Sequence, residues 1–152
     1  MTVAQLAREK ACYTNFSAPR SMSPRPRKAQ IVQYIGGKQK SGGAAIAALI
    51  NETAKRHGVK TYSEPFCGGL SVTYRIKMGV RAASDACVPL IKLYCAMQRG
   101  WTPPHELSRS EWERLRDAND PKDPMTAFAG FGCSHSGNWF GAYTDKFKRT
   151  NK

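Results

Sequence analysis

Two acidic residues follow short stretches whose composition favours β-strands. Glu64 comes after an extended run at residues 59–62, and Asp85 ends a second such run. A carboxylate carries several lone pairs, so an acid at a strand end can accept hydrogen bonds from both hydroxyls of a ribose. Gly68 and Gly69 lie between the two acids, and their lack of a Cβ lets a ligand approach the backbone. The spacing predicts a nucleotide-like ligand. A turn without a ligand, or an N-cap or surface role for Asp85, is the alternative.

A second glycine pair lies upstream, in the segment Tyr34-Ile35-Gly36-Gly37-Lys38. The chain thus carries Tyr-x-Gly-Gly-Lys, then Glu-Pro-Phe-x-Gly-Gly-x-Ser-Val, then an acid at a strand end. In order and spacing these motifs resemble the Dam-type adenine-specific DNA methyltransferases, a family with many phage members that uses S-adenosylmethionine. The resemblance is strong over residues 33–94, weaker as far as residue 143, and absent before residue 29.

The resemblance implies an α/β fold: a partial Rossmann-like S-adenosylmethionine-dependent methyltransferase fold with a small helical or hairpin DNA-recognition segment. In it, Tyr34 would lie against the adenine or the methionine part of the cofactor. Lys38 would meet the methionine carboxylate, and Glu64 would receive the ammonium group. A packed tyrosine and a solvated lysine are the alternatives for the first two. The cofactor positions that the resemblance implies are Tyr34, Gly36, Gly37, Lys38, Glu64, Pro65, Phe66, Cys67, Gly68, Gly69 and Asp85.

Residues 131–143, rich in glycine and aromatic side chains, are similar to the start of the family's DNA-recognition hairpin. The resemblance implies that Asn138 reads a base edge and that Tyr143, Lys146 and Lys148 lie along the DNA backbone. An aromatic packing loop is the alternative.

The family's catalytic Asp-Pro-Pro-Tyr motif, which would hold a flipped adenine, does not occur in this sequence. Asp120-Pro121 and Asp123-Pro124 lack the following proline and aromatic residue and precede the recognition segment, so we assign no catalytic residue. We therefore expect an adenine-specific DNA methyltransferase present as a truncated or split N-terminal portion. Its first strand would be an edge beside an uncovered apolar face, covered by a complementary chain or by self-association. A non-catalytic DNA-binding or partner-binding remnant, and a basic decoy or inhibitor, are the alternatives.

The charge of the chain indicates a polyanionic partner. It has 152 residues, with 24 basic and 11 acidic side chains and a net charge of +13. This favours double-stranded DNA, although a basic protein that binds none and a ribosome-associated protein also fit. No apolar run approaches the roughly 20 residues that span a bilayer, so we expect no membrane association. The five cysteines show no Cys-x-x-Cys spacing, which predicts neither a metal site nor a disulfide framework and fits a reducing cytoplasm, that of a bacterial host if the chain is phage-derived.

The pattern of apolar and turn residues predicts three parts: a disordered basic arm at 1–29, a cofactor-binding part at 30–100, and the start of the recognition region with a basic tail at 101–152. Apolar spacing predicts a helix at 43–57 whose core face carries Ile46, Leu49, Ile50 and Ala54. The other predicted elements are strands at 59–64 and 80–85 and helices at 70–78, 89–97, 109–116 and 125–131.

Overall fold

The computed structural model describes residues 32–38 and 42–145, and divides the chain into two compact units. The described part of the first unit runs from Gly36 to Asp85, and that of the second holds Val32–Ile35 and the chain from Ala86. The predicted arm at 1–29 lies outside the described residues. The boundary at residue 85 differs from the one expected near 100, because the helix at 88–98 buries its apolar face within the second unit.

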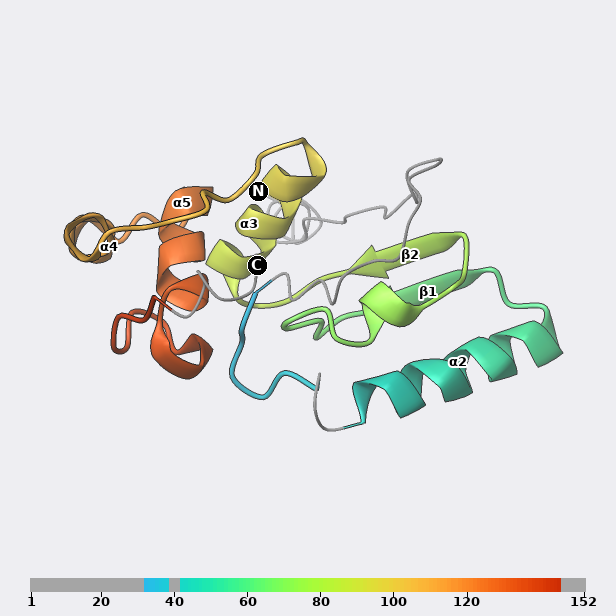
Figure 1. The fold of residues 1–152 in the computed structure, drawn as a ribbon. Coiled ribbons are helices and arrows are strands. Elements are labelled where there is room, and N and C mark those ends of the chain that lie inside the picture. The colour runs from blue at the N-terminus through green and yellow to red at the C-terminus, as the bar shows by residue number, and fades with distance from the viewer. Residues whose placement is uncertain (1–31, 39–41, 146–152) are drawn as a thin grey trace. The chain divides into compact units, whose positions relative to one another are not determined.

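The first unit opens with the helix α2 at Gly43–His57, whose bounds agree with the prediction (Figure 1). Gly58 ends it in the left-handed conformation, with φ 67°. The Gly58 N–H donates hydrogen bonds to the carbonyls of Ala54 and Lys55 in the last turn. The predicted core face is wrong in part: Ala54 is buried and Ile50 packs on the core, but Ile46 and Leu49 are 40% and 65% exposed. The helix instead packs on the rest of the first unit through its small residues, among them Ala47.

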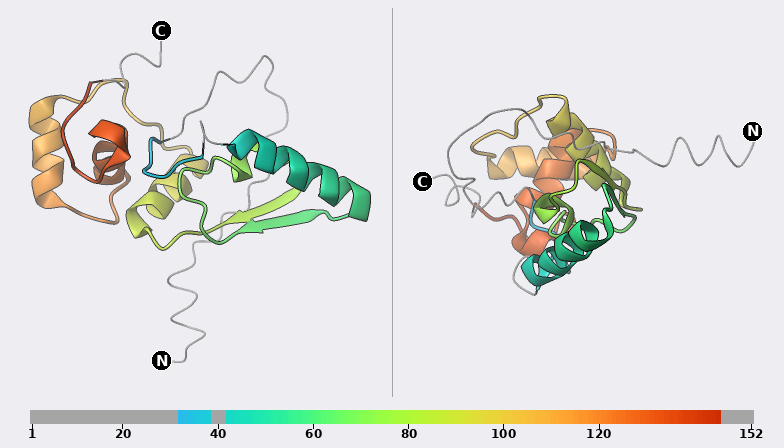
Figure 2. Two further views of the ribbon diagram at one scale, coloured as in Figure 1. Left: turned by 90° about the horizontal axis from the view of Figure 1, so that it is seen from below. Right: turned by 90° about the vertical axis from the view of Figure 1, so that its right-hand side faces the viewer.

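Two parallel strands form the sheet of the first unit, β1 at Thr61–Glu64 and β2 at Val80–Ala83, paired residue by residue from Thr61 with Val80 to Glu64 with Ala83. The helix α2 runs alongside both strands (Figure 2). Tyr62 packs with Ile50 and Met78 on a buried cluster of Ala47, Val72 and Ile76.

The edge of β1 that points away from β2 has no partner strand in the described part of the chain, which is what the sequence analysis expects. The uncovered apolar face that the sequence analysis expects beside this edge is not formed by β1 itself. The residues that β1 turns away from the buried cluster are polar, Thr61 and Ser63, and both are exposed. The exposed apolar side chains of this unit lie elsewhere, chiefly on α2 and at the two ends of the strands.

The predicted helix at 70–78 is wrong: the connection between the strands holds only a 3-10 turn, η1, at Thr73–Arg75. Leu70 has a φ of 57°, which no right-handed helix accepts, and Ile76 is extended. The Glu64 carboxylate also accepts a hydrogen bond from the Thr73 N–H at 3.0 Å. A side chain from β1 therefore satisfies a backbone group at the start of this turn.

The second unit consists of helices. They are α3 at Val88–Gln98, α4 at Arg109–Ala118, α5 at Pro124–Ala127, the π-helix η2 at Phe128–Gly132, which continues α5, and the 3-10 turn η3 at His135–Gly137. Leu90, Leu93 and Phe128 are among its fully buried side chains. The predicted helices at 89–97, 109–116 and 125–131 are confirmed within one or two residues.

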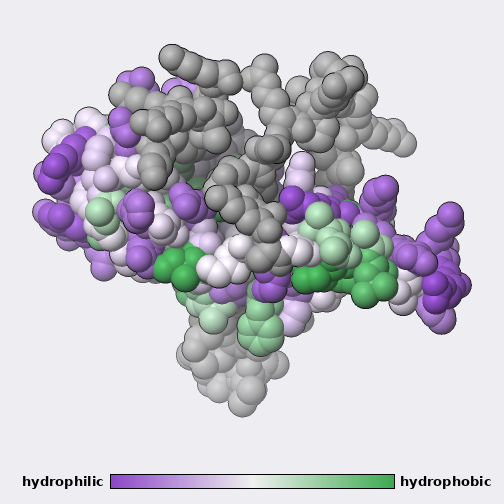
Figure 3. Space-filling view, turned by 60° about the horizontal axis from the view of Figure 1, so that its bottom comes forward, coloured by the Kyte–Doolittle hydropathy of each residue, from purple (hydrophilic) through white to green (hydrophobic). Residues whose placement is uncertain are grey.

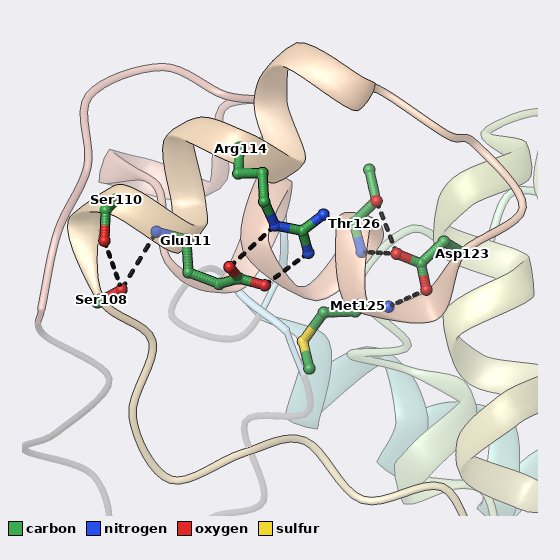
Figure 4. Close-up of polar contacts among 7 residues, drawn as sticks. All are labelled: Ser108, Ser110, Glu111, Arg114, Asp123, Met125 and Thr126. Atoms are coloured by element: carbon green, nitrogen blue, oxygen red, sulfur yellow. Dashed lines mark hydrogen bonds and ion pairs between the residues drawn. The ribbon is translucent and has the colours of Figure 1, made fainter.

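Local capping fixes where two of these helices begin (Figure 4). Ser108 Oγ accepts the Glu111 N–H at 3.1 Å, as the capping-box spacing predicts. Asp123 accepts the N–H groups of Met125 and Thr126, both at 3.0 Å, and also the Thr126 hydroxyl. The acid of the second Asp-Pro pair therefore caps a helix.

Trp112 is the polar link in the core of the second unit. It is 3% exposed, and its Nε1–H lies 3.1 Å from both the Ala129 carbonyl and Ser134 Oγ. The π-helix, with its wider hydrogen-bond spacing, contains Ala129. Phe140 and Tyr143 pack edge-on against the Trp112 ring at 5.4 and 5.9 Å. One side chain thus joins α4, η2 and the segment that follows.

Cys95, on α3, is disulfide-bonded. The sequence analysis predicts no disulfide, because no Cys-x-x-Cys spacing occurs. Burial raises the pKa of Cys133 to about 11, so this thiol stays protonated at neutral pH.

Candidate cofactor site at the carboxyl ends of the strands

The loop that leaves β1 is fastened to the end of β2 by its backbone. The Cys67 N–H donates to the Ser84 carbonyl at 2.9 Å, and the Leu70 N–H donates back to Cys67 at 2.8 Å. Gly68 has a φ of 44°, a conformation that glycine adopts without a steric penalty. The glycine turn is therefore placed beside the carboxyl ends of both strands, the usual edge for ligands in parallel sheets.

Asp85 holds this turn directly. Its Oδ2 accepts the Gly68 N–H at 2.8 Å, across 17 residues of sequence. The two motifs that the sequence analysis associates are thus joined by a hydrogen bond. A carboxylate has about four lone-pair sites, which is the acceptor chemistry that the two hydroxyls of a ribose require.

Glu64, at the end of β1, is drawn toward the same connection. Its Oε2 accepts the Thr73 N–H at 3.0 Å and also the Thr73 hydroxyl. Burial, followed by the charge of Glu64 and a hydrogen bond with it, raises the pKa of Tyr62 to about 12. The phenol therefore stays neutral beside the carboxylate at any physiological pH.

The surroundings of the turn combine an exposed aromatic ring with a buried hydroxyl. Phe66 is 82% exposed, whereas Cys67 is buried. Ser71 is 6% exposed, and its Oγ has no hydrogen-bond partner in the described part of the chain. Phe66 and Ser71 both lie within a few positions of the glycine pair in the sequence.

The first motif is divided between the two units. Tyr34 belongs to the second unit, where its ring lies edge-on to Phe131 at 5.4 Å. Gly36, Gly37 and Lys38 belong to the first, and the Lys38 carbonyl accepts the Gly43 N–H at 2.9 Å, where α2 begins. Of the two side chains of this motif that the resemblance assigns to the cofactor, Tyr34 and Lys38, it is Lys38 that shares a unit with Glu64 and Asp85. Its side chain is exposed and has no ion-pair partner among the described residues.

Tyr34 is anchored by the segment that the sequence analysis assigns to DNA recognition. Gly137 has a φ of 70°, and a Cβ there would lie 2.3 Å from the Gln33 carbonyl oxygen. The backbones of Gly137 and of residues 33–34 therefore touch. These stretches lie about a hundred residues apart in the sequence, and nothing in the sequence analysis predicts their contact.

The predicted DNA contacts fall into three groups. Asn138 is exposed, so its amide is accessible. Tyr143 is half-buried, and its hydroxyl donates to the Leu107 carbonyl at 2.6 Å while its ring packs on Trp112. This residue has a packing role, which was the alternative for its segment. Lys146 and Lys148 lie outside the described residues.

Sequence reasoning does not identify Thr73, Ser71 or Trp112. Thr73 bonds Glu64 through both its backbone and its side chain, but a lone threonine in an apolar run gives no signal. Trp112 falls at the spacing of a core face in α4, which predicts burial but not its two hydrogen-bond acceptors.

Among the described residues, no three His, Cys, Asp or Glu side chains are grouped so that they could hold a metal ion. None of the helices in the described ranges is long and apolar enough to cross a bilayer. Comparisons with protein-family models, with curated proteins and with solved structures found no match to this chain.

Proposed function

We propose that this chain is the cofactor-binding and early recognition part of a Dam-type adenine-specific DNA methyltransferase, built on a Rossmann-like sheet. The observation that carries the proposal is the hydrogen bond from the Gly68 N–H to Asp85, which brings the glycine motif and the strand-end acid together. S-adenosylmethionine would supply the methyl group that passes to the amine of an adenine, without a covalent enzyme intermediate.

Each residue of the turn has a distinct task in this proposal. Asp85 is the acceptor for the ribose hydroxyls. Glu64, held by Thr73, offers its carboxylate to the ammonium group of the cofactor. Phe66 presents an exposed ring against which the adenine stacks. Lys38 is a point charge for the methionine carboxylate.

Double-stranded DNA is the proposed partner because the net charge is +13. Every phosphate that is neutralised releases counterions, so the logarithm of the affinity should fall linearly with the logarithm of the salt concentration. Deletion of residues 1–28 should flatten this slope, measured by fluorescence anisotropy with a labelled duplex. An unchanged slope would show that this segment does not touch phosphate.

A non-catalytic DNA-binding or partner-binding role is the second candidate. Both Asp-Pro acids bond backbone N–H groups in the second unit: Asp120 accepts from Lys122 at 2.9 Å, and Asp123 caps α5. Both acids thus hold the local backbone, which favours a structural role for them. A methyl-transfer assay on the chain, alone and with any neighbouring reading frame, separates the two candidates.

The cofactor site is tested by calorimetry with S-adenosylmethionine on Asp85→Asn. The amide oxygen of the substituted side chain can still accept the Gly68 N–H, so the turn survives, but the negative charge and half of the acceptor capacity for a diol are lost. We expect the affinity to fall by about 1–3 kcal/mol, or roughly 5- to 150-fold.

Asp117→Asn is the matched control, since Asp117 is an exposed acid of α4 whose partner is its neighbour Arg116. It should leave the affinity unchanged. Asp85→Ala should in addition lower the free energy of unfolding, because it leaves the Gly68 N–H without its acceptor. Equal cofactor affinity in Asp85→Asn and the wild type would show that Asp85 only holds the turn.

A further inference from the structure

The amino-terminal ends of the two strands border an open groove that the proposed cofactor site does not use. It has a volume of about 800 Å3 and is lined by the last turns of α2, by residues 59–60 just before β1, and by residues 77–80 leading into β2. Its walls lie within the first unit. The glycine turn and Asp85 lie at the opposite, carboxyl ends of the same strands.

Hydrogen bonds hold the walls of this groove in place. The Asn51 side chain donates to the Arg75 carbonyl at 3.0 Å and accepts the Lys77 N–H at 2.8 Å. These two hydrogen bonds hold the chain that leads to β2 against α2. The Val59 N–H donates to the Ala54 carbonyl at 2.9 Å, which fixes the exit from α2. These bonds fix the backbone on which the lining side chains stand.

The floor is apolar although it faces solvent. Val59 is 48% exposed and Val80 is 51% exposed, and Met78 lies half-buried beside them. Apolar side chains also gather over α2, next to a strongly hydrophilic group at its carboxyl-terminal end (Figure 3). Exposed apolar area bordered by polar residues is typical of surfaces that bind a partner.

The rim carries unbalanced positive charge. Lys55, Lys60 and Lys77 line the groove, and among the described residues none of them forms an ion pair. The one acid of the lining, Glu52, is paired with Arg56 at 3.0 Å. The negative end of the α2 dipole lies here too, but the Gly58 and Val59 N–H groups cap its last carbonyls.

We propose that this groove binds an acidic amphipathic segment of a partner protein. Apolar side chains of that segment would cover Val59, Met78 and Val80, while its carboxylates meet the three lysines. Charge complementarity selects the acidic partner, and the exposed apolar floor favours a peptide over a nucleic-acid backbone, which offers phosphates but little apolar surface. The inference does not depend on the proposed cofactor site.

The probe is a labelled peptide with leucines at helical spacing on one face and glutamates on the other, titrated with the full chain and followed by fluorescence anisotropy. Lys60→Glu, Lys55→Glu and Lys77→Glu should each weaken binding about tenfold, because each removes one attraction and adds one repulsion. Lys122→Glu reverses an exposed lysine of the second unit and should change the affinity less than about twofold.

The floor is tested separately by Val80→Thr, which keeps the shape of the side chain and makes it polar. We expect about threefold weaker peptide binding. Val88→Thr is the matched control, since Val88 is 45% exposed on α3 and lies outside the groove.

A labelled DNA duplex forms the other arm of the experiment. If the lysine reversals weaken DNA binding and leave the peptide unaffected, the groove is a phosphate-contacting surface and the proposal is wrong. Peptide binding that is absent, or that responds equally to the groove variants and their controls, would overturn it as well.

Discussion

In the first unit two acidic side chains at the strand ends bond the connection between the strands, whereas in the second unit aromatic rings surround a buried tryptophan. In the first, Glu64 and Asp85 bond the connection between two strands, above a cluster centred on Ala47, Val72 and Ile76. In the second, Trp112 bonds Ala129 and Ser134 while rings from the following segment pack around it.

Glycines show the same contrast. Gly68 is required for its backbone conformation, because it has a positive φ and its N–H donates to Asp85. Gly130 is required because a ring packs closely against it: a Cβ there would lie 2.6 Å from the Trp139 ring. Glycine next to aromatic residues therefore does not by itself indicate DNA recognition. In the second unit it indicates close packing, which leaves Asn138 as the exposed recognition candidate.

The largest effect should come from Trp112→Ala. It removes a buried ring and both hydrogen bonds, and we expect a loss of about 3–5 kcal/mol in the free energy of unfolding. Ile76→Ala in the smaller cluster of the first unit should cost less, about 2 kcal/mol. Hydrogen exchange would show whether Trp112→Ala lowers protection in residues 90–131 and spares residues 47–76. Equal loss in both would mean that the units unfold together and the comparison fails.

Trp112→Phe separates packing from hydrogen bonding at the same position. The ring is largely kept, but the Ala129 carbonyl loses the indole donor. We expect a cost of about 1–2 kcal/mol in the free energy of unfolding, measured by urea denaturation. A cost as large as that of Trp112→Ala would show that the indole hydrogen bonds, and not the ring packing, dominate the core.

Helix ends were predictable because their signals are local. Gly58 ends α2 where the sequence analysis places it, and Ser108 with Glu111 opens α4 as the capping box predicts. The buried face of α2 was not predictable in full. Ala47 is buried and Leu49 is exposed because of the surface on which the helix packs, and that surface is not encoded in the helix itself. Periodicity favours large apolar residues, whereas close approach of the helix favours small ones.

The candidate site shows the same division. The strand ends at Glu64 and near Asp85 follow from alternation and turn residues, and the structure joins Asp85 to Gly68. The connection at 70–78 has a helical apolar pattern, yet Leu70 takes a left-handed φ and the Thr73 N–H donates to Glu64. This hydrogen bond joins residues of different elements, so local helix propensity does not predict it.

Gly137→Ala tests the anchoring of the Tyr34 segment. Gly58→Ala is its matched control, because both glycines have a φ near 70° but only Gly137 faces the backbone of residues 33–34. Gly58→Ala should cost about 1–2 kcal/mol from backbone strain alone. Gly137→Ala should cost at least about 1 kcal/mol more, since the backbones must separate. Equal costs in urea denaturation would show that residues 33–34 are not tied to Gly137.

The smallest effect concerns Tyr62 and the polar character of the first unit. Its pKa is raised to about 12 in the folded chain, by burial first and then by Glu64, from an ordinary value of 10.0. The unfolded chain therefore releases this proton first, so the contribution of Tyr62 to stability is complete below pH 10 and is lost as the pH rises from 10 to 12.

Tyr62→Phe should remove this part of the pH dependence. Tyr74→Phe, at a tyrosine that is 40% exposed, should keep it. Glu64→Gln removes the neighbouring charge and should complete the loss at a lower pH. The measurement is the urea midpoint of each variant between pH 9 and 12. A Tyr62→Phe protein that loses stability over this range as steeply as the wild type would show that the phenol does not depend on burial beside Glu64, and the first unit would then lose one of the polar contacts that distinguish it from the second.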